Sequence, residues 1–168
     1  RIVAVGNLDN TTADNVIDAH GKAVSPGFIN MIGWGVTSLI TDGRGLSDIT
    51  QGITLEVFGE GNSMGPLSPN MKTEFPKYWD EIQPQWTSLG EYLEFLETKG
   101  VAPNVASFIG ATTPRIHVLG QDDVDPTPKQ LQQMQELVRE AMREGAVGVA
   151  SSLIYTPASF AETAELIA

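Results

Sequence analysis

The stretch that decides the fold is PGFINMIGWGVTSLITDGRGLSDITQGITLEVF, residues 26–58. It contains a nearly continuous apolar run at residues 28–32, which is typical of a strand that is buried on both faces of a parallel sheet. Residues 53–58 predict a second strand. Residues 46–51 between them predict a short helix that ends at Gly52. The order strand, helix, strand predicts a parallel α/β unit.

The same alternation continues toward the C-terminus. A helix is predicted over residues 88–98 and an apolar strand over residues 104–110. Residues 146–150 form a fourth apolar run. Strands separated by helices or long excursions predict a parallel sheet, which is either half of a barrel or an open doubly wound sheet.

Capping residues mark the starts of two further helices. Thr127 is a predicted N-cap, Pro128 suits the first helical position, and Gln130 completes a capping box. Ser159 and Glu162 have the same spacing and predict a second capping box before a final helix.

The N-terminal part predicts a small β-hairpin, with apolar pairs at residues 16–17 and 23–24 around a turn at residues 20–22. Residues 59–87 instead read as a long loop that leaves the carboxyl end of a strand. A loop of this length inside a compact domain is usually functional or part of an interface.

Composition excludes several classes of function. The chain has 10 Lys and Arg against 21 Asp and Glu, a net charge of −11, which argues against nucleic acid as a partner. It has no cysteine, so disulfide and thiolate chemistry are excluded within it, and the compartment is left open. The sequence contains no run of about 18 apolar residues, which is the length that predicts a membrane span. The chain starts at Arg1 and stops inside a predicted helix, so we expect an incomplete piece of a longer enzyme.

Chemistry in a parallel α/β fold is expected at the carboxyl ends of strands. There, Glu60 is either a metal ligand or general base, or an exposed loop carboxylate. Arg115 either holds a substrate carboxylate or forms a structural salt bridge. Tyr155 either donates a hydrogen bond to a substrate or packs. His20 and His117 are far apart and are predicted to be structural.

Four segments carry a resemblance to a known family: VIDAHGKAVSPGFINM (16–31), QGITLEVFGEG (51–61), NVASFIGATTPR (104–115) and EGAVGVASSLIYTPASFAETAELIA (144–168). They resemble the amino-terminal part of the N-acyl-D-amino-acid deacylases of the amidohydrolase superfamily. The resemblance implies an α/β fold: residues 27–168 as the first four units of a (β/α)8 TIM-type barrel, and the hairpin of residues 1–26 as part of a small β-sandwich domain. It also implies zinc-dependent hydrolysis of a small-molecule N-acyl amino acid at a C–N bond other than a peptide bond.

The resemblance also shows where the chain departs from the family. The family's Asp-x-His-x-His falls on Asn30, Ile32 and Trp34, its Asn-Cys-Gly on residues 60–62, and its Gly-His-Gly on residues 110–112. The usual His-x-His positions are therefore Ile32 and Trp34, which are not zinc ligands. Glu60 remains as a metal ligand, and the catalytic carboxylate is expected on later strands.

The residues expected to bind substrate are Tyr155, which matches the family, together with Arg115 and Ser152. Three readings stay open: a metal-dependent amidohydrolase, a non-catalytic amidohydrolase-like barrel that serves as a binding or scaffold protein, and an unrelated α/β enzyme. A half barrel leaves open strand edges and an apolar face. We therefore expect these 168 residues alone to be inactive and to self-associate.

Overall fold

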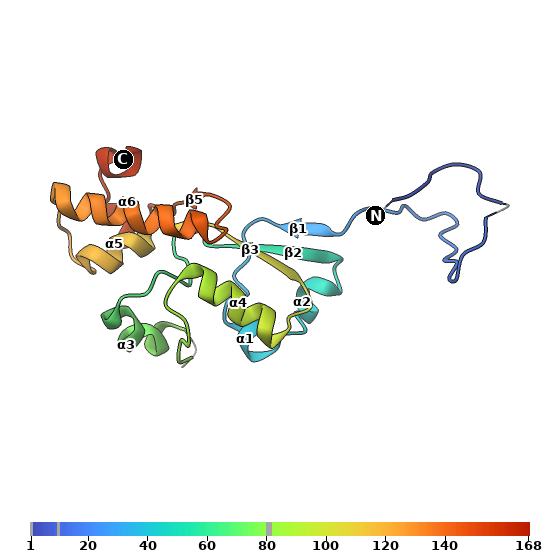
Figure 1. The fold of residues 1–168 in the computed structure, drawn as a ribbon, viewed down its shortest axis with the longest axis horizontal. Helices are drawn as coiled ribbons and strands as arrows, with labels where there is room; N and C mark the ends of the chain where they lie inside the picture. The colour runs from blue at the N-terminus through green and yellow to red at the C-terminus, as the bar shows by residue number, and fades with distance from the viewer. Residues whose placement is uncertain (1, 10, 80–81) are drawn as a thin grey trace.

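The computed structural model describes residues 2–9, 11–79 and 82–168. A body of helices and strands carries a long N-terminal segment that extends away from it (Figure 1). Seven α-helices and one 3-10 helix are found in the described residues. They are α1 (Ser38–Thr41), α2 (Leu46–Ile49), α3 (Pro69–Tyr78), α4 (Leu89–Lys99), α5 (Thr112–Leu119), α6 (Pro128–Arg143), η1 (Ala158–Phe160) and α7 (Thr163–Ile167).

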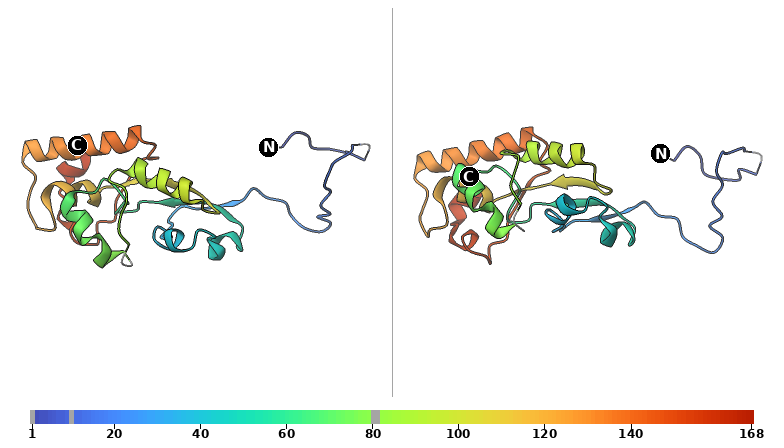
Figure 2. Two further views of the ribbon diagram at one scale, coloured as in Figure 1. Left: turned by 60° about the horizontal axis from the view of Figure 1, so that its bottom comes forward. Right: turned by 90° about the horizontal axis from the view of Figure 1, so that it is seen from below.

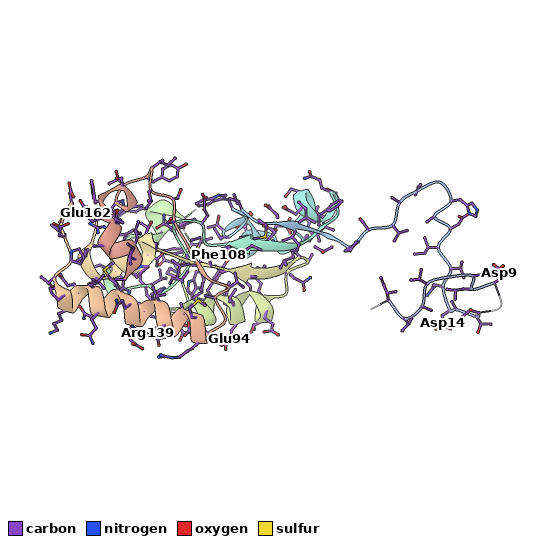
Figure 3. The ribbon with its side chains drawn as sticks, turned by 90° about the horizontal axis from the view of Figure 1, so that it is seen from above. Asp9, Asp14, Glu94, Phe108, Arg139 and Glu162 are labelled. Carbon is purple, nitrogen blue, oxygen red and sulfur yellow. The ribbon has the colours of Figure 1, made fainter. Side chains whose placement is uncertain are left out.

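The strands pair in parallel, as the sequence predicts. Strands β1 (Phe28–Asn30), β2 (Ile53–Phe58) and β3 (Asn104–Ser107) form one sheet in the order β1-β2-β3. Strands β4 (Ile109–Gly110) and β5 (Val149–Ala150) form a second parallel pair. The run predicted as one strand over residues 104–110 is thus divided at Phe108, which is labelled in Figure 3. Its backbone N–H still donates to the carbonyl of Phe58 at 2.8 Å, so β2 spans the break.

Of the two capping boxes predicted from the sequence, one is present. The capping box of Thr127 and Gln130 is present at α6, and Ser88 and Glu91 form another at α4. The box predicted for Ser159 is wrong. Ser159 lies inside the 3-10 turn, the chain is extended at Ala161, and α7 begins after Glu162 without a side-chain cap.

Helix α3 lies inside the loop predicted over residues 59–87, and helix α5 was not predicted. The start of α3 carries the signal used for α6, because Ser68 accepts from the N–H of Met71 and Pro69 follows it. Pro76 inside that helix argues against a helix when the sequence alone is considered, since proline is normally excluded from helix interiors. Helix α5 follows Ala111, which makes no side-chain cap, so no local signal marks its start.

The hairpin expected before residue 26 is not formed. Residues 2–9 and 11–27 contain no strand, and only the turn is present, where Lys22 N–H donates to Ala19 at 2.8 Å. Val16 and Ile17 are more than 80% exposed, and Asp9 and Asp14 are seen far from the body in Figure 3. An isolated two-stranded hairpin is marginal in water, and the described residues place no further strand beside this segment.

The core lies on one side of the β1-β2-β3 sheet, where Figures 1 and 2 show α1 and α4. Its aromatic centre is Trp86, which packs against Phe75, Tyr92 and Phe95 with ring centroids 5.1–5.8 Å apart. The other buried apolar residues include Val36, Leu39, Phe58, Met64, Leu67, Leu89, Leu96, Ile109 and Ala141.

The expectation that residues 28–32 are buried on both faces is wrong. Phe28, Ile29, Met31 and Ile32 are each more than half exposed. The reason is that β1 is an edge strand and the described residues place no second layer over it. Within the same residues, no helix has the length and apolar character needed to cross a membrane.

Candidate functional site

The carboxyl ends of β2, β4 and β5 meet and form the floor of the candidate site. The N–H of Thr112 donates to the carbonyl of Gly61 at 3.0 Å, and that of Ala111 donates to Ala150 at 2.8 Å. A Cβ atom added to Gly110 would lie 2.3 Å from the Gly61 oxygen, so the two backbones are in direct contact. Three of the segments expected to carry chemistry therefore come together here.

Two buried hydroxyls fix the loop after β2 to α5. The backbone N–H of Ser63 donates to Thr113 Oγ1 at 2.8 Å, and the Ser63 hydroxyl donates to the carbonyl of Gly65 at 2.6 Å. Ser63 is 8% exposed and Thr113 is 1% exposed. The hydroxyls of Ser63 and Thr113 therefore have hydrogen-bond partners, which offsets the cost of burying them.

Gly61 and Ser152 are in contact. Gly61 has a φ of 75°, and a Cβ atom built on it would lie 2.9 Å from the Cβ atom of Ser152. A side chain at this position would meet both an unfavourable backbone conformation and a steric conflict. Ser152, predicted from the sequence to bind substrate, thus lies against the loop that follows β2.

Glu60 lies at the start of that loop and is half-buried. Its carbonyl accepts from the N–H of Asn62 at 2.9 Å. Across residues 2–9, 11–79 and 82–168, no group of three or more His, Cys, Asp or Glu side chains is arranged to hold a metal ion. Glu60 is therefore not part of a metal-binding cluster in this segment.

A second carboxylate, Glu56 in the middle of β2, is buried to 2% exposure. Its Oε1 atom has no hydrogen-bond partner, and its Oε2 atom would lie 2.8 Å from a Cβ atom added to Gly35. Burial raises the pKa of Glu56, and the negative charge of Asp48 raises it further. The only sequence signal for this group was one acidic residue inside the apolar run ITLEVF, and it was missed.

A cleft of about 330 Å³ opens beside the floor. Asn62, Ser63 and Thr113 line it at the strand ends, and Thr156 and Pro157 line it from the loop after β5. Its apolar wall is provided by Leu67, Met71, Phe75, Trp79 and Ile116. The cleft could not be found from the sequence, because the wall depends on α3 and α5.

Known proteins resemble the chain over 99% of its length. N-acyl-D-aspartate deacylase from Alcaligenes xylosoxydans xylosoxydans is 34% identical over 172 aligned residues, which are 34% of that enzyme. The crystal structure of D-aminoacylase, described as defining a novel subset of amidohydrolases, superposes with a TM-score of 0.83 at 32% identity. The expected resemblance to the N-acyl-D-amino-acid deacylases is confirmed.

A third match extends the resemblance to a complex with inhibitor. The N-acyl-D-glutamate deacylase of Bordetella bronchiseptica, solved with zinc and a phosphonate mimic of the tetrahedral intermediate, gives a TM-score of 0.80 at 29% identity. The chain spans about a third of these deacylases, 34–36% of their lengths. No protein-family model matches it.

The described residues do not form a complete zinc site by themselves. The family's His-x-His falls on Ile32 and Trp34 and its cysteine on Gly61, and none of these binds zinc through its side chain. Gly61 also lacks room for a thiol, because Ser152 contacts it. Within the described residues, Glu60 is the one acidic side chain at the positions where the deacylase motifs fall.

Arg115 forms the structural ion pair that was the alternative to substrate binding. Its side chain is 1% exposed, its Nη1 atom lies 2.5 Å from Glu165 Oε2, and its Nη2 atom donates to the carbonyl of Val124 at 2.8 Å. The guanidinium therefore joins α5 to α7 and to the loop between α5 and α6.

Tyr155 and the histidines lie in separate places. Tyr155 is 60% exposed, and its carbonyl accepts from the N–H of Ser159 at 2.9 Å, which holds the loop after β5. His20 pairs with Asp18 in the N-terminal segment, whereas His117 lies on α5 with Nδ1 3.4 Å from the carbonyl of Pro66. The two histidines do not form a common site, as the sequence predicts.

Proposed function

We propose that the full-length protein is a hydrolase that cleaves the amide bond of N-acyl-D-amino acids. The observation that carries the proposal is the match of 99% of the chain to D-aminoacylase at a TM-score of 0.83. In this reaction water adds across the C–N bond, so that the acyl carbon gains the hydroxyl group and the amine gains the proton. The products are a carboxylate and a free D-amino acid.

The domain organisation follows the same resemblance. We assign residues 27–168 to the first four β/α units of a barrel and residues 1–26 to a small β-sandwich domain. The parallel pairing of β1-β2-β3 and of β4-β5 supports the first assignment. The exposure of Val16, Ile17 and Val24 supports the second, because these apolar residues need a partner surface to be buried.

The residues of this chain then have distinct roles. Tyr155 and Ser152 lie on the loop after β5, beside the floor, and are proposed to contact the substrate. Arg115, also expected to do so, is proposed to hold α5 and α7 in place through Glu165, and its role in binding is indirect. Glu60 is the proposed contribution of this segment to a zinc site, with the other ligands supplied by residues beyond those described.

Two measurements test the proposal on purified full-length protein: metal content by elemental analysis, and release of D-amino acid from N-acetyl-D-aspartate and N-acetyl-D-glutamate. We expect about one zinc per chain, stereospecific release of the D-amino acid, and a reduced zinc content in Glu60→Ala. Glu94→Ala, an exposed substitution on α4, is the matched control and should keep its zinc. Protein without zinc and without hydrolysis would instead support a non-catalytic barrel.

A further inference from the structure

We propose that the cleft between α3, α5 and the loop after β5 binds the acyl group of the substrate and selects for long apolar chains. This inference rests on the proposed function and adds the substrate class. The cleft volume of about 330 Å³ is at the lower end of the range for small-molecule sites. One end of it borders the strand-end floor through Asn62 and Ser63.

The charge of the lining decides which half of the substrate fits. No Lys, Arg or His is found among the described residues that line the cleft, and its one charged member is Glu74. The carboxylate of Glu74 is paired with Lys77 at 2.6 Å. A substrate carboxylate placed here would find no cation among the lining side chains, and Lys77 is already paired with Glu74. The uncharged acyl chain is therefore the half that the cleft accepts.

The lining is mixed, with an apolar wall on one part of it, and its further polar members, Asn62, Gln121 and Thr156, are uncharged. The hydroxyls of Ser63 and Thr113 are engaged with each other and with Gly65. Beside them, Met71, Phe75 and Trp79 provide an apolar wall along α3. Burying alkyl groups against such a wall stabilises a complex by about 0.8 kcal/mol per methylene, roughly a fourfold gain in affinity.

The wall is held rigidly by the core. Phe75 is 4% exposed, stacks on Trp79 with ring centroids 5.8 Å apart, and makes an edge contact with Trp86 at 5.8 Å. The indole N–H of Trp86 donates to the carbonyl of Met64 at 2.5 Å. A wall fixed in this way needs little ordering when it binds a chain, which favours affinity.

The test compares N-octanoyl-D-glutamate with N-acetyl-D-glutamate on the full-length protein, by calorimetric Kd and by kcat/KM. We expect the octanoyl compound to bind at least about tenfold more tightly. Met71→Ala should lower the ratio of the acetyl Kd to the octanoyl Kd severalfold. Met71→Trp, which narrows the cleft, should lower this ratio further. Met142→Ala on α6, a methionine outside the cleft and 45% exposed, is the matched control and should keep the wild-type ratio.

The two proposals fail separately. Hydrolysis of both compounds with equal Kd values, and no effect of either Met71 substitution, would overturn the acyl cleft and leave the deacylase function intact. Preferential binding of the octanoyl compound without hydrolysis of either would keep the cleft and overturn the activity. Circular dichroism of each variant establishes that a lost preference does not come from unfolding.

Discussion

At the scale of single residues, Glu56 is a buried carboxylate with one unpaired oxygen. It is 2% exposed, its Oε1 atom has no hydrogen-bond partner, and burial raises its pKa above the ordinary 4.5. Between pH 4.5 and the raised pKa, the folded chain holds a proton that the unfolded chain has lost. The free energy of unfolding therefore falls as the pH rises through that range.

Replacing Glu56 by glutamine should remove this dependence. We expect Glu56→Gln to unfold with a free energy higher by on the order of 1 kcal/mol at pH 7, since the buried charge is gone. The two proteins should converge below pH 4.5. Urea denaturation followed by tryptophan fluorescence at pH 4 to 8 measures this, with Glu94→Gln as the exposed control. A stability of Glu56→Gln below that of wild type at neutral pH would contradict it.

Gly61 is constrained in two ways, and the chain offers a control that separates them. Gly61 has a φ of 75° and a contact with Ser152, whereas Gly100 has a φ of 78° with nothing within 4 Å. We expect Gly100→Ala to cost about 1 kcal/mol from backbone strain alone, and Gly61→Ala to cost about 1 to 2 kcal/mol more. In the double variant, Ser152→Gly should remove the additional loss of stability caused by Gly61→Ala, because the side chain that it meets is gone. Equal losses for the two alanine variants would show that the contact is without effect.

At the scale of elements, the ion pair of Arg115 and Glu165 joins α5 to α7. Both side chains are buried, at 1% and 6% exposure. Removing one partner leaves the other charge uncompensated in the interior, so Glu165→Gln should lower the free energy of unfolding by about 3 kcal/mol.

The exposed ion pairs of Glu136 on α6 are the control for the buried pair of Arg115 and Glu165. Glu136 pairs with Arg139 and Arg143 at 3.2 and 3.1 Å, with all three side chains more than half exposed. Solvent screens such pairs, so Glu136→Gln should change stability very little. Thermal and urea unfolding of the two variants measure the contrast. An equal effect of both would show that Arg115 finds another partner when Glu165 is neutral.

At the scale of the whole molecule, one side of the sheet is covered and the other is open. Phe28, Met31, Ile32 and Trp34 are more than half exposed along the chain that forms and follows β1. Open strand edges and apolar faces of this kind promote association. We therefore expect the isolated 168-residue chain to self-associate in spite of its net charge of −11.

Sedimentation velocity at several concentrations tests this expectation. The weight-average sedimentation coefficient should rise with concentration, and Ile32→Lys should reduce the rise by placing a charge on the open face. Val16→Lys, on the N-terminal segment and 85% exposed before substitution, is the control. A compact monomer that melts cooperatively at every concentration would contradict the expectation.

The sequence by itself determined the elements whose signals lie within a few residues. The apolar run of β2 and the capping box of α6 were both predicted, because an element of this kind is specified by its own side chains and its own backbone. The resemblance to the deacylases likewise came from contiguous segments. The absence of zinc ligands at residues 32, 34 and 61 could be read directly from the chain.

Only the tertiary structure decided which groups meet. Ser63 and Thr113 are 50 residues apart, as are Arg115 and Glu165, and neither pairing leaves a local signal. The burial of Glu56 and the wall of the acyl cleft depend in the same way on helices packed from elsewhere in the chain. The physical reason is that caps and periodicity act over one or two turns of chain, whereas burial and ion pairing depend on what the rest of the fold places nearby.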